Sequence, residues 1–316
     1  MALWAQAHAA LFESVVQPAV FHLGLVSWLE ASFDATEIFM IGAAEVVVLA
    51  VLLGALEKWR PVEVWADRRA VRVDVAYTLL VRLGVLPLAI FFLLLPVVDG
   101  LDGWLRMHDI IPPKLEDAFP ALFDHPVASF LAYLVVIDFV LYWVHRAQHA
   151  FGWWWALHAL HHSQREMTFW TDDRNHLLDM VITDLVLAVA ALLVGVAPGQ
   201  FVAIVALTQL LESLSHANLR LSFGPWLGRV LVSPQYHRLH HRIGLGHESA
   251  GEGSLGGHNF AVLFPLWDLL FGSARFDGRY EPTGIRDQLP ASGGRDYGSG
   301  FWAQQWLGLR RLAGRG

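Results

Sequence analysis

Ten histidines between residues 145 and 241 are the side chains of this chain best suited to chemistry. Eight are paired or clustered and two are solitary, in the order His145, His149, His158, His161, His162, His176, His216, His237, His240 and His241. Side chains three or four residues apart lie on the same face of a helix. Each cluster therefore presents two or three imidazoles in one direction, and the pattern predicts a metal site rich in nitrogen ligands.

The histidine clusters are numerous enough for two metal ions. Neutral imidazole binds iron, zinc, copper and nickel. The chain contains no cysteine, which excludes disulfides, iron–sulfur clusters and thiolate zinc sites, so nitrogen and oxygen must hold any metal. A site for two ions needs roughly eight to ten protein ligands where carboxylates are scarce. The spacing alone leaves the roles of the solitary His176 and His216 open.

Polar side chains close to the histidines could orient the imidazoles by hydrogen bonding. Asp138 lies seven residues before His145, on the same helical stripe, inside an otherwise apolar segment. Glu212 lies four residues before His216, and Asn218 lies two residues after it. Because an acceptor bonded to a ligand imidazole fixes its tautomer, we expect Asp138, Glu212 and Asn218 to support the metal ligands.

The remaining histidines are isolated along the sequence. They are His8, His22, His108, His125, His247 and His258. A single histidine in a membrane protein is more often a polar contact than a ligand. We expect these six histidines to lie outside the set of metal ligands, either at the protein surface or next to the ligands.

The segments that position the histidines are strongly apolar. Hydrophobic residues make up 55% of the 316-residue chain and charged residues 16%, whereas soluble domains carry about 25% charge. Segments 39–56, 75–98, 127–144, 177–196 and 201–214 are close to the length of a membrane-spanning helix. Segment 11–33 either spans or lies at the interface. The chain is therefore predicted to be an all-α, multi-pass membrane bundle of about four to six transmembrane helices.

Loop charges orient these segments. The loop after segment 39–56 carries five basic residues, whereas the loop after segment 75–98 is mainly acidic. Since basic loops stay in the cytoplasm, both histidine blocks are expected at the cytoplasmic face, in one site. The net charge of −7 gives no basic surface for nucleic acid.

The chain is predicted to have three regions. Residues 1–126 form an N-terminal membrane region, and residues 127–274 carry the histidines. Residues 275–316 form a cytoplasmic tail. Its final part places Trp302 and Trp306 among basic residues, which favours a helix lying on the membrane surface.

The order H-x3-H, H-x-x-H-H and a later H-x-x-H-H resembles the fatty acid hydroxylase/sterol desaturase superfamily of membrane di-iron oxygenases. The resemblance covers about residues 127–274. Smaller motifs extend it: Arg174-Asn-His176, followed by Leu177 where sterol-type members have proline; His216-Ala-Asn218; Pro234-Gln-Tyr-His237; Asn259-Phe260; and Trp267-Asp268 before Phe271-Gly-Ser273.

The resemblance implies that two iron ions activate O2 and oxidise an unactivated C–H bond of a lipid. Hydroxylation and desaturation both remain open. It also implies that His176 and His216 complete the ligand set. An external donor, such as a b-type cytochrome, a ferredoxin or a reductase, would supply electrons. An alternative of another class is a membrane protein that binds or transports metal ions.

Overall fold

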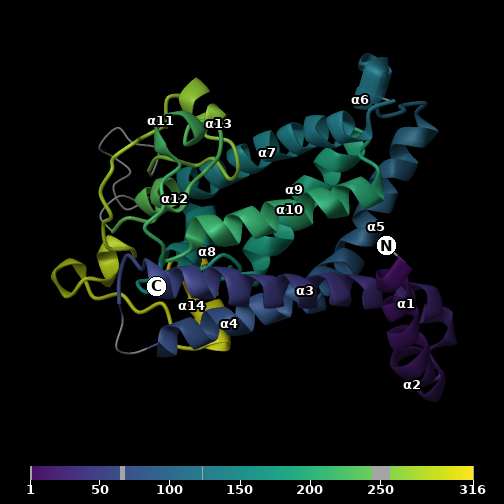
Figure 1. Ribbon diagram of the computed structural model, residues 1–316, viewed down its shortest axis with the longest axis horizontal. Helices are drawn as coiled ribbons and strands as arrows, with labels where there is room; N and C mark the ends of the chain where they lie inside the picture. Colours follow the sequence, from purple (N-terminus) through teal and green to yellow (C-terminus); the bar gives the residue numbers. More distant parts are fainter. Residues whose placement is uncertain (1, 65–67, 123, 244–256, 316) are drawn as a thin grey trace.

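The computed structural model describes residues 2–64, 68–122, 124–243 and 257–315, and over these residues the protein is helical (Figure 1). No strand occurs in these ranges, which contain only an isolated bridge between Arg242 and Thr283. The all-α prediction is confirmed. His247 lies outside the described residues.

Six long helices form the body of the molecule. They are α3 (Leu29–Trp59), α4 (Arg69–Arg82), α5 (Val85–Met107), α7 (Pro126–Ala150), α9 (Leu177–Leu193) and α10 (Pro198–His216). The shorter helices are α1 (Ala2–Leu11), α2 (Gln17–His22), α6 (Leu115–Ala118), α8 (Gly152–His162), α11 (Gly224–Leu227), α12 (Pro234–His240), α13 (Leu266–Leu270) and α14 (Phe301–Leu312).

Three described helical segments are long and apolar enough to cross a membrane: Val26–Trp59, Val85–Met107 and Pro126–Ala150. This is fewer than the four to six expected, and α9, with 17 residues, is shorter than these segments. Exposed apolar side chains such as Val51 on α3 and Leu93 on α5 provide a surface suited to lipid.

The predicted span 75–98 is wrong as a single helix. The chain ends α4 at Arg82, turns at Gly84 with φ of 82°, and begins α5 at Val85. Glycine adopts this left-handed conformation without the steric cost of a Cβ, so the helix is interrupted there. Segment 11–33 is likewise divided, since α1, a π-helical turn (Phe12–Val16), α2 and a 3-10 turn (Val26–Trp28) precede α3.

The helices that carry histidines meet at one end of the bundle. Helices α7 and α10 end there, α9 begins there, and α8 and α12 lie across the same end (Figure 1). Between α7, α9 and α10 an apolar core contains Ile137, Leu187 and Ile204, packed with Leu263 from the C-terminal region. The core holds the three helices side by side, so the histidines that follow it are brought together.

Candidate metal centre

Nine of the ten predicted ligands converge in three overlapping groups of buried histidines. Within each group the ring nitrogens lie within 4.8 Å of one another. The groups are His145, His149, His158 and His162; His161, His216, His237 and His241; and His162, His240 and His241. Since two members of the third group belong to the first and second, the three groups form one continuous centre.

Local helix geometry explains the convergence. The last two turns of α7 carry His145 and His149, and α10 ends at His216. The short helix α12 begins at Pro234, where the Ser233 hydroxyl accepts a hydrogen bond from the Tyr236 amide. This cap and a proline at the first position stabilise a helix of only seven residues.

The second group has the spacing of ligands around one ion. The Nε2 atom of His216 lies 3.1 Å from that of His161 and 2.9 Å from that of His237, and the Nε2 atoms of His237 and His241 are 3.1 Å apart. Metal–nitrogen bonds of about 2.0–2.1 Å place neighbouring ligands about 2.9–3.4 Å apart in octahedral or tetrahedral shells. The imidazoles therefore stand where a bound ion would require them.

Several imidazoles are fixed so that one nitrogen faces the centre. The Nδ1 atom of His145 donates to Phe260 O at 2.8 Å, and that of His240 donates to His258 O at 2.7 Å. Their Nε2 atoms are buried and have no hydrogen-bond partner among the described residues. Because a buried polar atom without a partner is costly, a cation bound at these nitrogens fits the site.

The charge state of the histidines suits metal binding. Burial, reinforced by the neighbouring imidazoles, lowers the pKa of His161, His162 and His241 well below the usual value. These rings are therefore neutral near pH 7. Neutral imidazole is the form that binds a metal ion.

Asp179 is the carboxylate that supports the first group. It accepts hydrogen bonds from His158 Nδ1 at 3.1 Å, Gln148 Nε2 at 2.8 Å and Trp154 Nε1 at 2.6 Å. These donors come from α7 and α8, whereas Asp179 is on α9. Sequence reasoning missed this role, although an acidic residue in an apolar segment was a signal for it.

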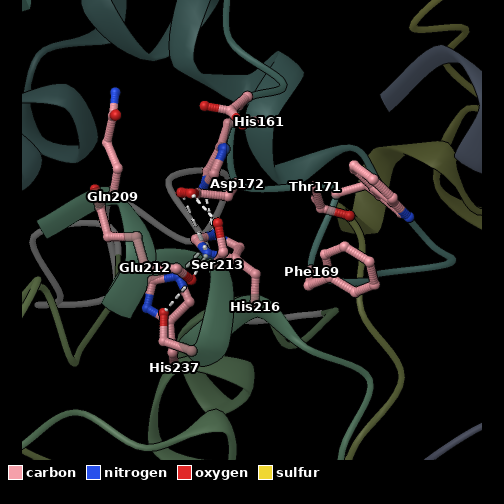
Figure 2. Close-up of polar contacts among 12 residues, drawn as sticks. His161, Phe169, Thr171, Asp172, Gln209, Glu212, Ser213, His216 and His237 are labelled. Carbon is pink, nitrogen blue, oxygen red and sulfur yellow. Dashed lines mark hydrogen bonds and ion pairs between the residues drawn. The ribbon is translucent and has the colours of Figure 1, made fainter. Parts of the chain in front are cut away.

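A buried polar network supports the second group, and its members Asp172 and Ser213 lie beside His216 (Figure 2). Asp172 accepts from the Ser213 hydroxyl at 2.9 Å and from Arg82 Nη2 at 2.8 Å. Its other oxygen lies 3.6 Å from His216 Nδ1, which donates to Glu212 O at 2.8 Å. The network joins α4 and α10 to the loop before α9.

Among the described residues, the side chains of Asp138, Glu212 and Asn218 accept no hydrogen bond from an imidazole, in contrast to the expectation. Asp138 instead accepts from the amides of residues 263 and 264 and from Trp267 Nε1, which ties α7 to the C-terminal region. Asn218 Oδ1 accepts from the amides of residues 62 and 63. Glu212 supports His216 only through its backbone carbonyl, because a helical carbonyl lies beside the ring four residues later.

The structure places His176, which was expected to be a metal ligand, outside the three histidine groups. Its Nε2 atom donates to Gln305 O at 2.9 Å, and its Nδ1 atom accepts from Leu178 N at 3.1 Å. Both ring nitrogens are therefore occupied. The side chain caps the first turn of α9 and faces α14 rather than the other histidines.

A cavity of about 200 Å³ adjoins the centre, between α7, α9 and α10. Its histidine end includes His145, His161 and His237, and its apolar lining includes Leu187 and Ile204. A largely apolar ligand could therefore extend from the core of the bundle to the imidazoles.

Residues 130–273 match the family model described as fatty acid hydroxylase. An ornithine lipid hydroxylase from Rhizobium tropici is 26% identical over 280 residues, which cover 87% of this chain and 79% of that protein. An alkylglycerol monooxygenase from Caenorhabditis elegans is 29% identical over 46% of this chain and 26% of its own length. A Delta(7)-sterol 5(6)-desaturase from Gibberella zeae is 24% identical over 48% of this chain and 47% of its own length.

No solved structure matches the chain significantly. The relatives are hydroxylases, monooxygenases and desaturases, and the matched region contains the nine converging histidines. The prediction made from the histidine motifs is confirmed: residues 130–273 match the fatty acid hydroxylase model, and the relatives support the fatty acid hydroxylase/sterol desaturase superfamily.

Proposed function

We propose that this protein is a membrane oxygenase that binds two iron ions and hydroxylates an unactivated C–H bond of a lipid with O2. The observation that carries the proposal is the set of nine buried, converging histidines beside a partly apolar cavity. The names of the relatives support an oxidoreductase that acts on lipids.

The histidine groups divide naturally between two ions. The first group, on α7 and α8, would hold one iron, and the second, on α8, α10 and the segment of α12 and His241, would hold the other, with His240 beside members of both groups as a further ligand. When bound, iron supplies O2 activation and oxidation of the C–H bond. The chain's own contribution is orientation, since Asp179 and the carbonyls of Phe260 and His258 fix the rings of three ligands.

The same arrangement supports a route by which a lipid could reach the histidines. It also supports an assignment of the side of the membrane that the site faces. The cavity lies between α7, α9 and α10 and has apolar lining residues such as Leu187 and Ile204, so a lipid chain could contact these while one carbon reaches the imidazoles. Arg220 N donates to Arg60 O, and this contact places the basic segment after α3 at the histidine end. By the positive-inside rule, that end faces the cytoplasm.

Electrons must come from a partner. The sequence contains no recognisable flavin, haem or iron–sulfur motif. A b-type cytochrome, a ferredoxin or a reductase at the cytoplasmic face would therefore reduce the irons.

Metal analysis and lipid mass spectrometry test the proposal together. Protein purified from membranes should contain two irons per chain, and lipids of expressing cells should gain one oxygen relative to cells with an empty vector. His161→Ala and His240→Ala should lower iron content and abolish the lipid product while the protein remains in the membrane. Loss of two hydrogens instead would indicate a desaturase, whereas bound zinc with no O2-dependent lipid change would refute the oxygenase.

A further inference from the structure

The cavity beside the histidines is unusually acidic for a space inside an apolar bundle. Its lining includes five carboxylates, and no lysine or arginine occurs among its described lining residues. The five are Asp172, Asp173, Asp179, Asp184 and Glu212. The first three have partners, because Arg82 pairs with the two adjacent aspartates and Asp179 accepts three hydrogen bonds.

The other two carboxylates, Asp184 and Glu212, differ from these three in their surroundings. Each lines the cavity, and no described residue donates a hydrogen bond or an ion pair to either carboxylate. Their neighbours on the lining include Thr183, Thr208 and Gln209. A carboxylate that faces a cavity and has no partner can accept hydrogen bonds from a bound cation or other donor, which lowers the cost of removing it from water.

The two carboxylates lie between the histidines and the apolar end of the cavity. Glu212 is one helical turn before His216 on α10, which corresponds to about 6 Å along the helix axis. On α9, Asp184 lies five residues beyond Asp179 and three residues before Leu187. A ligand in this space would meet imidazoles, then carboxylates, then apolar side chains.

We propose that the cavity selects a lipid that carries a positively charged amine, with Asp184 and Glu212 binding the ammonium group close to the metal centre. This inference rests on the proposed function and names the substrate class of that site. The carboxylates would provide charge-assisted hydrogen bonds to the amine, while the apolar lining contacts the hydrocarbon next to it. A neutral lipid of the same length would lack these bonds.

Binding of two matched probes tests the proposal without any turnover. Hexadecylamine, protonated at neutral pH, and hexadecanol would be titrated into metal-free protein in neutral detergent, with tryptophan fluorescence as the readout. We expect the amine to bind at least about tenfold more tightly than the alcohol, as one or two charge-assisted hydrogen bonds would give. Metal-free protein is used because a free amine can itself coordinate a metal.

Substitutions test whether Asp184 and Glu212 cause the preference for the amine. Asp184→Asn and Glu212→Gln should each reduce the amine preference severalfold, and the double variant should abolish it, with hexadecanol binding retained as evidence of folding. Asp184→Glu should retain the preference, and so should Asp99→Asn, which neutralises an exposed carboxylate on α5. Equal binding of both probes by the unmodified protein, or loss of the preference in the Asp99 variant, would overturn the proposal.

The proposed reaction and the proposed amine site can be refuted independently of each other. If cells oxidise lipids but the protein shows no amine preference, the oxygenase stands and the amine site is refuted. If the preference holds but no lipid is oxidised, the site stands as a binding site and the proposed reaction is refuted.

Discussion

At the scale of single residues, histidine spacing predicted which side chains form the metal centre. It did not predict the groups that accept hydrogen bonds from these imidazoles. Eight of the nine converging histidines come from clusters whose i, i+3 and i, i+4 spacing fixes a shared helix face, and helix packing brings these clusters and His216 together. The groups that hold the rings in place, such as Phe260 O and His258 O, come from segments distant in sequence. Only the folded chain brings these acceptors to the rings, so no local pattern identifies them.

Asp179 should control metal affinity through His158. Asp179→Asn replaces a carboxylate that accepts three hydrogen bonds with an amide that offers a single acceptor oxygen. We expect iron affinity to fall by about 10–100-fold, as is usual when a partner of a ligand histidine is lost. Iron titration of metal-free protein measures the effect, and Asp102→Asn, in an exposed ion pair, is the control. Unchanged affinity would contradict the assigned role.

His176 and His216 should respond differently to substitution. His176→Asn keeps a side chain that can cap α9, so the protein should retain its full iron content. His216→Ala removes a member of the second group and should lower the iron content. Metal analysis of both purified variants measures how much iron each one retains. Equal iron loss in the two would restore His176 to the ligand set.

At the scale of helices, the apolar segments were predicted well and their interruptions were not. The predicted segments 39–56 and 127–144 lie inside α3 and α7. The break at Gly84 was missed because the sequence remains apolar across it, whereas the fold requires Arg82 to meet Asp172, Asp173 and Glu45. Gly84 permits the turn, and the ion pairs of Arg82 hold the end of α4 in place.

Arg82 should be essential for stability. Arg82→Met would leave three buried or nearly buried carboxylates without their cation. Breaking a buried ion pair by removing one partner costs about 3–5 kcal/mol. We expect a marked drop in the thermal unfolding temperature and in yield from membranes. Arg106→Met, which breaks an exposed pair on α5, should change neither, and equal stability of the two variants would contradict the prediction.

The C-terminal helix α14 packs on α8 and α4, with its buried face against His176. Gln305 accepts from Leu177 N and donates to the Tyr77 hydroxyl, both at 2.8 Å. The predicted interfacial helix is thus present at residues 301–312, and Trp302 and Trp306 lie on its exposed side. Its membrane contact remains a prediction.

Gly308 permits this packing. A Cβ atom at Gly308 would lie 2.3 Å from His176 Cδ2, so the His176 ring or α14 must shift. Although alanine favours helix formation, Gly308→Ala should destabilise the protein by about 1–3 kcal/mol through overpacking. Thermal unfolding measures this, and Gly300→Ala, where a Cβ would meet nothing within 4 Å, is the matched control. A stabilised Gly308 variant would contradict the close approach.

At the scale of the whole molecule, the sequence predicted that helices crossing the bundle return both histidine blocks to one end, and the structure confirms this (Figure 1). The shape of the cavity and its two unpartnered carboxylates could not be predicted, because they depend on how α7, α9 and α10 pack. The same packing places the cavity beside the centre. The proposed lipid oxidation would therefore depend on the assembled bundle rather than on any one motif.

Isotope labelling tests the central claim most directly. Iron-loaded protein in lipid vesicles, supplied with a reductant and oxygen-18 gas, should yield a lipid that carries one labelled oxygen atom, and the His161→Ala and His240→Ala variants should yield none. Failure of the iron-loaded, reduced protein to incorporate label into any lipid, or equal incorporation by the variants, would contradict the account.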